Sequence, residues 1–381
     1  MVSDGDRSAL RNRRSFLKGA GVAGVAALAG CSGNQGGDGG DGDSSGSDGD
    51  GGGDGDGGDT SVDWTLGTSG PDSATHASGV AMSQVISEQS DRISTSAQTT
   101  QGTAANPRLI DNGDIDVAQS TSWAVERANA GQEPYADPEL GTTLTQVLPF
   151  MSIEFYLIKR DIPELSDVET VSDIPQDGSI SMAFGQRGGT NFFAGLDGFN
   201  LSGIDNVAEK YDLQSLSWGD QRAQLSDGRL DIGMGYSISQ VTLTGWEQEL
   251  DATQEIDVVE WEFTEEDIVT SGLPYEYIEG PADVWEQDIR IDNIPSVGVG
   301  YMTIFPASVS QEIAYEFVSL VHDNVEAVRE ASSVLQGAGP DLTENLMLAA
   351  ENSPVHPGTE QFMREEDIWR EDLLSLENYE S

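Results

Sequence analysis

Apolar and polar positions along the chain predict alternating strands and helices, first over residues 62–120. Three short apolar runs have the length of buried strands: residues 62–69, 93–98 and 116–120. Apolar residues at helical spacing from Ala77 to Val85 predict a helix between the first two strands, and a second helix is predicted over 103–112. This strand–helix–strand–helix–strand order is typical of an open parallel sheet.

Residues 178–233 repeat the same order. The predicted strands cover residues 180–184, 215–218 and 231–236, and the predicted helices begin at Asn191 and Asp220. The glycine-rich turn Gly185–Thr190 separates the first of these strands from the first helix.

The two stretches match at a constant offset of 115 residues. Ile110–Ala118 matches Leu225–Gly233, Gly70 matches Gly185, and Thr75 matches Thr190. In the longest match, a glycine able to adopt a positive φ ends a helix, and an apolar–Asp–apolar step leads into a buried strand. Two units that converged on the same capping chemistry would explain that match alone. The offset shared by distant landmarks favours two lobes of the same topology.

Two longer apolar runs, 144–159 and 296–305, are predicted to cross between these lobes, and a helix is predicted over 308–334. The expected fold is therefore α/β, with two lobes around a cleft and two crossover strands. Lobe 1 is predicted to hold residues 62–152 and 297–381, and lobe 2 residues 153–296.

The N-terminus predicts export and a lipid anchor. Arg13 and Arg14 precede Phe-Leu-Lys as in a paired-arginine export signal. The apolar run 19–30 is too short to span a bilayer but has the length of a signal h-region. Leu-Ala-Gly then leads to Cys31, the only cysteine, which we interpret as the site of lipid attachment within a signal over residues 1–30. A buried helix with a buried cysteine is the alternative.

Residues 31–61 are nearly all Gly, Asp and Ser, which predicts a disordered tether or, alternatively, a passive low-complexity insert. The whole chain has a formal net charge of −49. Self-repulsion at that charge predicts a strongly saline environment, because salt screens it. Nucleic acid and anionic membrane surfaces are excluded as partners because both require basic patches. The expected membrane contact is the anchor alone, at the outer face of the cell membrane.

Polar residues in the predicted strand-to-helix turns are the candidate ligand contacts, because ligands of open α/β sheets bind beyond the carboxyl ends of the strands. These candidates are Ser69, Ser73, Thr75, Thr100, Thr103, Ser120 and Thr121 in lobe 1, and Gln186, Arg187, Thr190, Asn191 and Tyr236 in lobe 2. Neutral hydrogen-bonding groups with one arginine suit a carboxylate or another small polar molecule. The alternative is that the Ser and Thr residues only cap helices.

Other chemistry is weakly represented. Three widely spaced histidines and one cysteine predict no metal site, and no motif indicates a cofactor. Trp218 and Trp261 are interpreted as core residues. We therefore expect that the protein is not an enzyme. An exported lipid-anchored hydrolase is the alternative, and it would require paired carboxylates in the cleft.

Four motifs over residues 62–372 resemble the solute-binding subunit of TRAP transporters of the TAXI type. Gly102–Asn106 is similar to the family's Gly-Ser-x-x-Asn, Gly113–Asp116 to its Gly-x-x-Asp, and Gly185–Thr190 to its glycine-rich turn. The most specific motif is Pro-x-His-Pro-Gly, here Pro354–Gly358.

The resemblance implies a type II periplasmic-binding-protein-like fold and uptake of a carboxylate or amino acid, such as glutamate, through integral membrane transporter subunits. The family's Gly-Gly-Thr-Tyr-Tyr is absent, since Asp72–His76 stands at that place; the ligand therefore stays open. His356 is expected to be structural. The same fold serving an ATP-driven importer, or a sensory receptor, remains an alternative.

Overall fold

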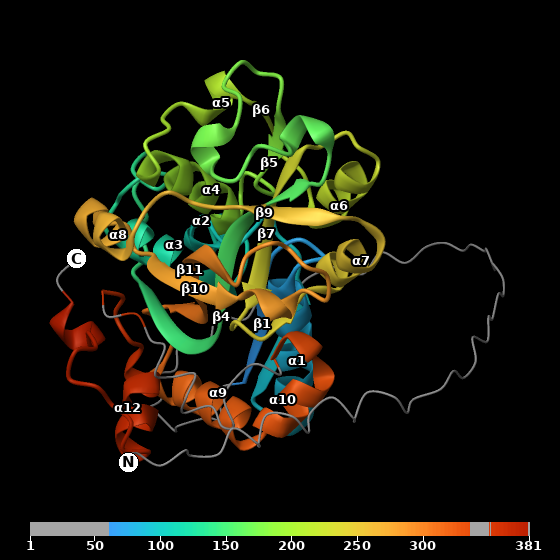
Figure 1. Cartoon of the computed structure of the whole chain (residues 1–381). Helices are drawn as coiled ribbons and strands as arrows, with labels where there is room; N and C mark the ends of the chain where they lie inside the picture. Colours follow the sequence, from blue (N-terminus) through green and yellow to red (C-terminus); the bar gives the residue numbers. More distant parts are fainter. Residues whose placement is uncertain (1–60, 336–349, 351, 380–381) are drawn as a thin grey trace, which may run out of the picture. The chain divides into compact units, whose positions relative to one another are not determined.

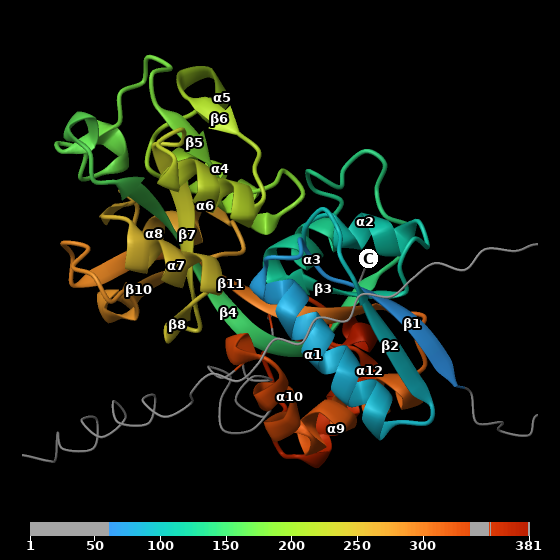
Figure 2. The same ribbon diagram turned by 90° about the vertical axis from the view of Figure 1, so that its right-hand side faces the viewer.

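The computed structural model describes residues 61–335, 350 and 352–379. The predicted export signal, Cys31 and all of the predicted tether except residue 61 lie outside the described residues. The described part forms two α/β lobes, and two long strands, β4 (Leu144–Arg160) and β11 (Asn293–Pro306), connect them (Figures 1 and 2). This confirms the two-lobed α/β fold with two crossover strands.

Lobe 1 is built on a parallel sheet. Its strands are β1 (Val62–Gly67), β2 (Ile93–Gln98) and β3 (Val117–Thr121), and β1 pairs in parallel with both others. Its first helices are α1 (Ala74–Gln89), α2 (Asn106–Asp111) and α3 (Ser122–Asn129). β11 then adds to β3 in the antiparallel sense and brings the chain back to this lobe.

Lobe 2 repeats that sheet. Its strands are β5 (Ser181–Ala183), β6 (Asp212–Gln214) and β7 (Ile232–Ile238), with β5 parallel to both others. The helices between them are α4 (Thr190–Leu201), α5 (Val207–Lys210) and α6 (Trp218–Ser226), followed by β8 (Thr242–Leu243), α7 (Gly245–Thr253), β9 (Ile256–Val259), α8 (Glu265–Ser271) and β10 (Glu276–Pro281). One hydrogen-bonded path, β2-β1-β3-β11-β4-β7-β5-β6, therefore runs through both lobes.

The 115-residue repeat has the same physical role in each lobe. Gly113 and Gly228 both have a positive φ, of 74° and 73°, as the pattern predicts. Three residues after each glycine, an aspartate accepts from a backbone N–H of the neighbouring strand: Asp116 from Thr65 at 2.8 Å, and Asp231 from Ser181 at 3.0 Å. The carboxylate fixes the register of two parallel strands at the point where their ladder begins.

A buried side-chain amide in each lobe lies at the same offset. Asn106 of α2 donates to the Gln119 carbonyl, and Gln221 of α6 donates to the Met234 carbonyl. Each amide therefore fixes its helix to the strand that follows. The sequence pattern contained this pair, although neither residue was predicted to have this role.

The C-terminal helices cover lobe 1. The helix predicted over 308–334 is in fact two helices, α9 (Gln311–Asp323) and α10 (Val325–Ala331). They separate at Asn324, whose side chain donates to the Leu320 carbonyl and whose backbone (φ −116°, ψ 23°) is not helical. α12 (Pro357–Glu365) packs along α9.

His356 directly precedes α12, whose first turn it caps, and is fully buried. Its Nδ1 accepts from the Gly358 N–H at 3.2 Å, so the proton is on Nε2, which donates to the Val309 carbonyl at 3.1 Å. Burial lowers the pKa of His356 to about 4. Its contacts are structural, as the motif implies.

Two other predicted elements were displaced. The strand predicted over 215–218 lies earlier, at Asp212–Gln214, because Ser217 caps α6: its Oγ accepts from the Asp220 N–H at 3.1 Å. The helix predicted over 103–112 begins only at Asn106. In both cases residues before the helix form the turn that faces the other lobe. The predicted lobe boundaries, 152/153 and 296/297, fall inside the continuous strands β4 and β11 and stay predictions.

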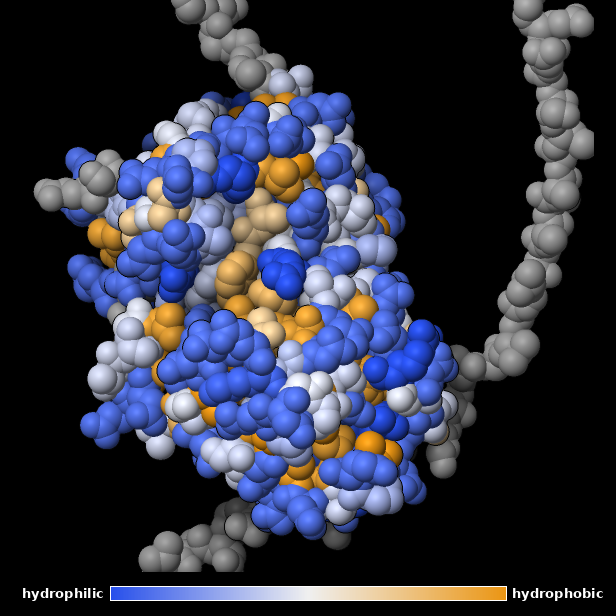
Figure 3. Space-filling model, turned by 90° about the horizontal axis from the view of Figure 1, so that it is seen from above, coloured by the Kyte–Doolittle hydropathy of each residue, from blue (hydrophilic) through white to orange (hydrophobic). Residues whose placement is uncertain are grey.

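The surface of the described part is mostly hydrophilic on the face in Figure 3, with a band of apolar side chains between the hydrophilic ones. None of the helices in the described part is long and apolar enough to cross a membrane.

Candidate functional site

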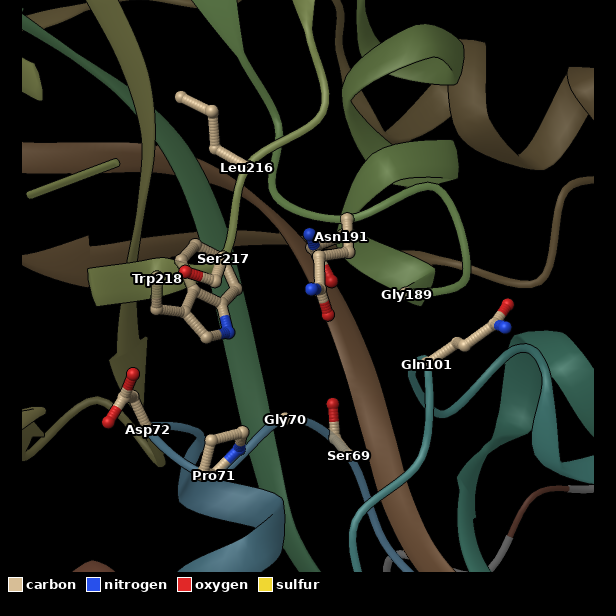
Figure 4. A pocket seen from close by; sticks show the side chains of 11 residues that line it. Ser69, Gly70, Pro71, Asp72, Gln101, Gly189, Asn191, Leu216, Ser217 and Trp218 are labelled. Carbon is tan, nitrogen blue, oxygen red and sulfur yellow. The ribbon is translucent and has the colours of Figure 1, made fainter. Parts of the chain in front are cut away.

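Two adjoining pockets lie where the strand-to-helix turns of the lobes meet, and together we call them the cleft. The first encloses about 320 Å³, partly open to solvent, and is lined by Ser69, Gly70, Pro71, Asp72, Gln101, Gln186, Gly189, Asn191, Leu216, Ser217 and Trp218 (Figure 4). The second has a volume of about 260 Å³, also partly open to solvent, and is lined by Ser69, Ser73, Ala74, Thr75, Thr103, Ile153, Phe155, Asn191, Trp218, Tyr236 and Tyr301. Three residues, Ser69, Asn191 and Trp218, are shared by both pockets.

Seven of the twelve predicted ligand contacts line the cleft: Ser69, Ser73, Thr75, Thr103, Gln186, Asn191 and Tyr236. Their sequence positions in strand-to-helix turns explain this, since those turns come together at the edges of the two facing sheets. The structure therefore brings them together, while their contact with a ligand stays a prediction.

Five predicted contacts do not line either pocket: Thr100, Ser120, Thr121, Arg187 and Thr190. Thr100 and Ser120 donate instead to the carbonyls of Thr68 and Thr103 within lobe 1. The guanidinium of Arg187 lies 5.3 Å from the centre of the Phe192 ring.

Thr121 and Thr190 are part of a buried hydroxyl cluster between the lobes. Thr190 Oγ1 lies 3.1 Å from Thr103 Oγ1 and 2.9 Å from Thr121 Oγ1. Thr103 and Thr121 belong to lobe 1 and Thr190 to lobe 2, so these two hydrogen bonds exist only while the lobes are in contact.

A backbone contact lies beside the hydroxyl cluster. The Ala105 N–H of lobe 1 donates to the Gly188 carbonyl of lobe 2 at 3.1 Å. Gly102 permits this approach, because a Cβ at that position would lie 2.4 Å from the Gly188 oxygen. The glycine-rich turn Gly185–Thr190 thus uses one of its carbonyls to hold lobe 1.

Three helices begin at the cleft, and their N-termini carry free backbone N–H groups. Ser73 precedes α1 and Ser217 precedes α6, and each caps its helix with its Oγ, at 3.0 and 3.1 Å from the N–H groups of His76 and Asp220. The capping alternative therefore holds for Ser73, and also for Thr121, which caps α3. Gly189 precedes α4, which has no side-chain cap.

An aromatic wall borders the cleft on the side of lobe 2. The ring of Trp218 stacks on the ring of Trp246, with 5.5 Å between their centres, and its centre lies 4.9 Å from the centre of the Tyr236 ring. Behind the wall, Glu247 Oε1 accepts from the Tyr236 N–H at 2.7 Å, and burial raises the pKa of Glu247 to about 8. The carboxyl fixes the backbone that carries the wall.

Trp218 is partly buried against the core, as predicted, but it also lines both pockets of the cleft, whereas Trp261 packs in the core against Phe199. One signal could have identified Trp218 as a residue of the cleft. It directly follows Ser217 in a strand-to-helix turn, and the other candidate ligand contacts were chosen from such turns. Gln101 and Asp72 were also missed; they precede the polar candidates Thr103 and Ser73 by only one or two residues.

Asp72 is the only carboxylate that lines the cleft, so a hydrolase's carboxylate pair is not among the lining residues. Within the described ranges, no group of three or more His, Cys, Asp or Glu residues is arranged to hold a metal ion.

The fold and the cleft define a two-lobed, ligand-binding class of protein. Residues 66–366 match the model of the NMT1-like family, and the chain belongs to this family of periplasmic solute-binding proteins. No significant match to the chain was found among curated proteins.

Several solved structures are similar to the chain at low identity. The aliphatic sulphonate-binding protein SsuA from Escherichia coli is 11% identical, with 82% of this chain and 94% of that chain covered and a TM-score of 0.39. The binding protein of a phosphonate ABC transporter from Pseudomonas aeruginosa is 11% identical, with 81% and 88% covered and a TM-score of 0.46. At this similarity they carry no information about the ligand.

Proposed function

We propose that this protein is an extracytoplasmic receptor that captures a small carboxylate or amino acid in its cleft and delivers it to integral membrane transporter subunits. The observation that carries the proposal is the cleft built from turns of both lobes, three of which begin helices. Backbone N–H groups at these helix ends can receive a carboxylate, and contacts to both lobes favour the closed state. Catalysis has no part in this function.

Titration calorimetry in 2 M KCl tests the proposal. Carboxylates and amino acids are added to the protein without its predicted signal, residues 31–381. A binding isotherm accompanied by a smaller radius of gyration in X-ray scattering is the expected result. Heat without compaction, or neither signal, would contradict closure around a ligand.

The transporter is proposed on separate grounds. The motifs resemble those of TAXI-type subunits and imply an ion-driven TRAP transporter, while the family match fits an ATP-driven importer at least as well. Uptake of labelled ligand by cells decides between them. A TRAP partner predicts loss of uptake when the ion gradient is collapsed at constant ATP, and an importer predicts loss when ATP is depleted.

The lipid anchor is proposed from the sequence alone. Cys31→Ser should move the exported protein from the membrane fraction to the medium, whereas Arg13→Lys with Arg14→Lys should retain it inside the cell. Cell fractionation with an antibody measures both effects. A Cys31→Ser protein that stays with the membrane would remove the anchor from the proposal.

A further inference from the structure

The charge of the cleft selects among the ligands proposed above. Its lining includes one carboxylate, Asp72, and no Lys, Arg or His side chain. Arg187, the expected counter-charge for a carboxylate, is not among the lining residues. A purely anionic ligand would therefore enter a cleft whose one charged side chain repels it.

Asp72 lies beside the aromatic wall. Figure 4 shows its carboxylate and the indole of Trp218 on one side of the first pocket, with Asn191 and Gln101 on the other. A carboxylate together with a tryptophan ring is a favourable environment for an organic cation, because the ring quadrupole and the charge both attract it.

Gly219 leaves room for Asp72 to approach lobe 2. A Cβ at Gly219 would lie 3.0 Å from Asp72 Oδ2, so this carboxylate of lobe 1 lies against the first turn of α6. Asp72 and Trp218 thus come from different lobes, and the pair is complete only when the lobes meet.

The helix N-termini complement this pair. The first turns of α1 and α4 line the cleft, through Ala74 and Thr75 and through Asn191, and can receive a carboxylate. A molecule with both groups would bind the carboxylate there and the amine at Asp72.

We propose that the ligand carries a protonated amine, held between the Asp72 carboxylate and the Trp218 ring. This inference rests on the proposed function and deepens it: of the two ligand classes named there, the amino acid is bound and the plain carboxylate is rejected.

Matched ligand pairs test the inference by calorimetry in 2 M KCl. The probes are L-leucine with 4-methylpentanoate and L-glutamate with glutarate, which differ only in the amine. We expect at least one amino acid to bind the natural protein about tenfold or more tightly than its partner compound, and Asp72→Asn to reduce that ratio to about threefold or less. Asp205→Asn, which changes an exposed carboxylate of lobe 2 outside the cleft lining, should leave the ratio intact.

The outcomes separate two failures. If Asp72 only caps α6 across the lobes, Asp72→Asn weakens both members of a pair equally and the ratio survives, which overturns the inference. Tighter binding of the compound without the amine overturns it too, while the receptor function stands. Absence of binding by all four probes would count against the proposed ligand class itself, and the inference would fall with it.

Discussion

The buried hydroxyl of Thr190 makes hydrogen bonds to Thr103 and Thr121 across the two lobes, at 3.1 and 2.9 Å. Each such bond contributes roughly 1 kcal/mol net. Thr190→Val keeps the shape and removes both bonds, so the closed state should lose roughly 1–3 kcal/mol and apparent ligand affinity should fall about 5- to 150-fold. Calorimetry measures the affinity.

The matched control for this change is Thr253→Val, in an exposed residue at the end of α7 whose hydroxyl donates to the Glu249 carbonyl. It should leave the affinity unchanged. Unaltered affinity in Thr190→Val would show that the hydroxyl cluster does not contribute to closure.

His356 makes a prediction for pH. Its folded pKa of about 4 lies below the ordinary value of 6.5, so the unfolded chain binds the additional proton between these values. The contribution of the neutral imidazole is complete above pH 6.5 and is lost as pH falls toward 4. Chemical unfolding should show roughly 2 kcal/mol lost between pH 7 and pH 5 from this residue.

His356→Asn should remove that part of the pH dependence, because an amide does not titrate here and still offers an acceptor for the helix end. His322→Asn is the control, since His322 contacts the Phe362 ring on the same part of lobe 1. If the free energy of unfolding depends on pH in the same way in both variants between pH 7 and pH 5, this part of the pH dependence does not come from His356.

At the scale of elements, the turn between β2 and α2 is one of the parts of lobe 1 that contact lobe 2. Gly102→Ala should block closure, because the added Cβ would lie 2.4 Å from the Gly188 oxygen and φ at this position is +140°. We expect ligand affinity to fall more than tenfold and the radius of gyration to stay large with ligand present. X-ray scattering and calorimetry on one preparation measure both.

Gly113→Ala separates backbone strain from the interlobe contact. Gly113 also has a positive φ, of +74°, but a Cβ there would meet nothing within 4 Å. The substitution Gly113→Ala should therefore destabilise lobe 1 by about 1 kcal/mol and leave closure of the lobes intact. Equal loss of affinity in the two variants would assign the effect to strain alone.

The sequence predicts these elements best where local chemistry repeats. Gly113 and Gly228 could be identified because a helix-ending glycine and a strand-leading aspartate occur twice at one offset. Trp218 was predicted to end a strand over 215–218 and to belong to the core, and only the Ser217 cap shows that a helix begins there. Local pattern cannot reveal which turn residues face the other lobe, since contacts such as Ala105 with Gly188 depend on how the lobes meet.

At the scale of the whole molecule, net charge decides the conditions under which the lobes stay folded. The chain carries 67 acidic and 18 basic side chains, for a formal net charge of −49. The ion pairs seen are mostly at the surface, such as Arg222 with Glu249 at 2.7 Å, where each contributes under about 1 kcal/mol. They cannot offset self-repulsion over an entire acidic surface, so folding should depend on the screening provided by dissolved salt.

We therefore expect the thermal midpoint to rise by about 10 °C or more between 0.1 and 2 M KCl, with most of the rise complete once the Debye length reaches about 3 Å near 1 M. Calorimetric scans measure it. Sucrose solutions provide the comparison, because an excluded neutral solute strengthens burial without screening charge. A rise that continues linearly to 3 M KCl would indicate a salting-out effect on apolar burial instead. A midpoint independent of salt would exclude self-repulsion as the limiting term, and with it the proposed adaptation to a saline environment.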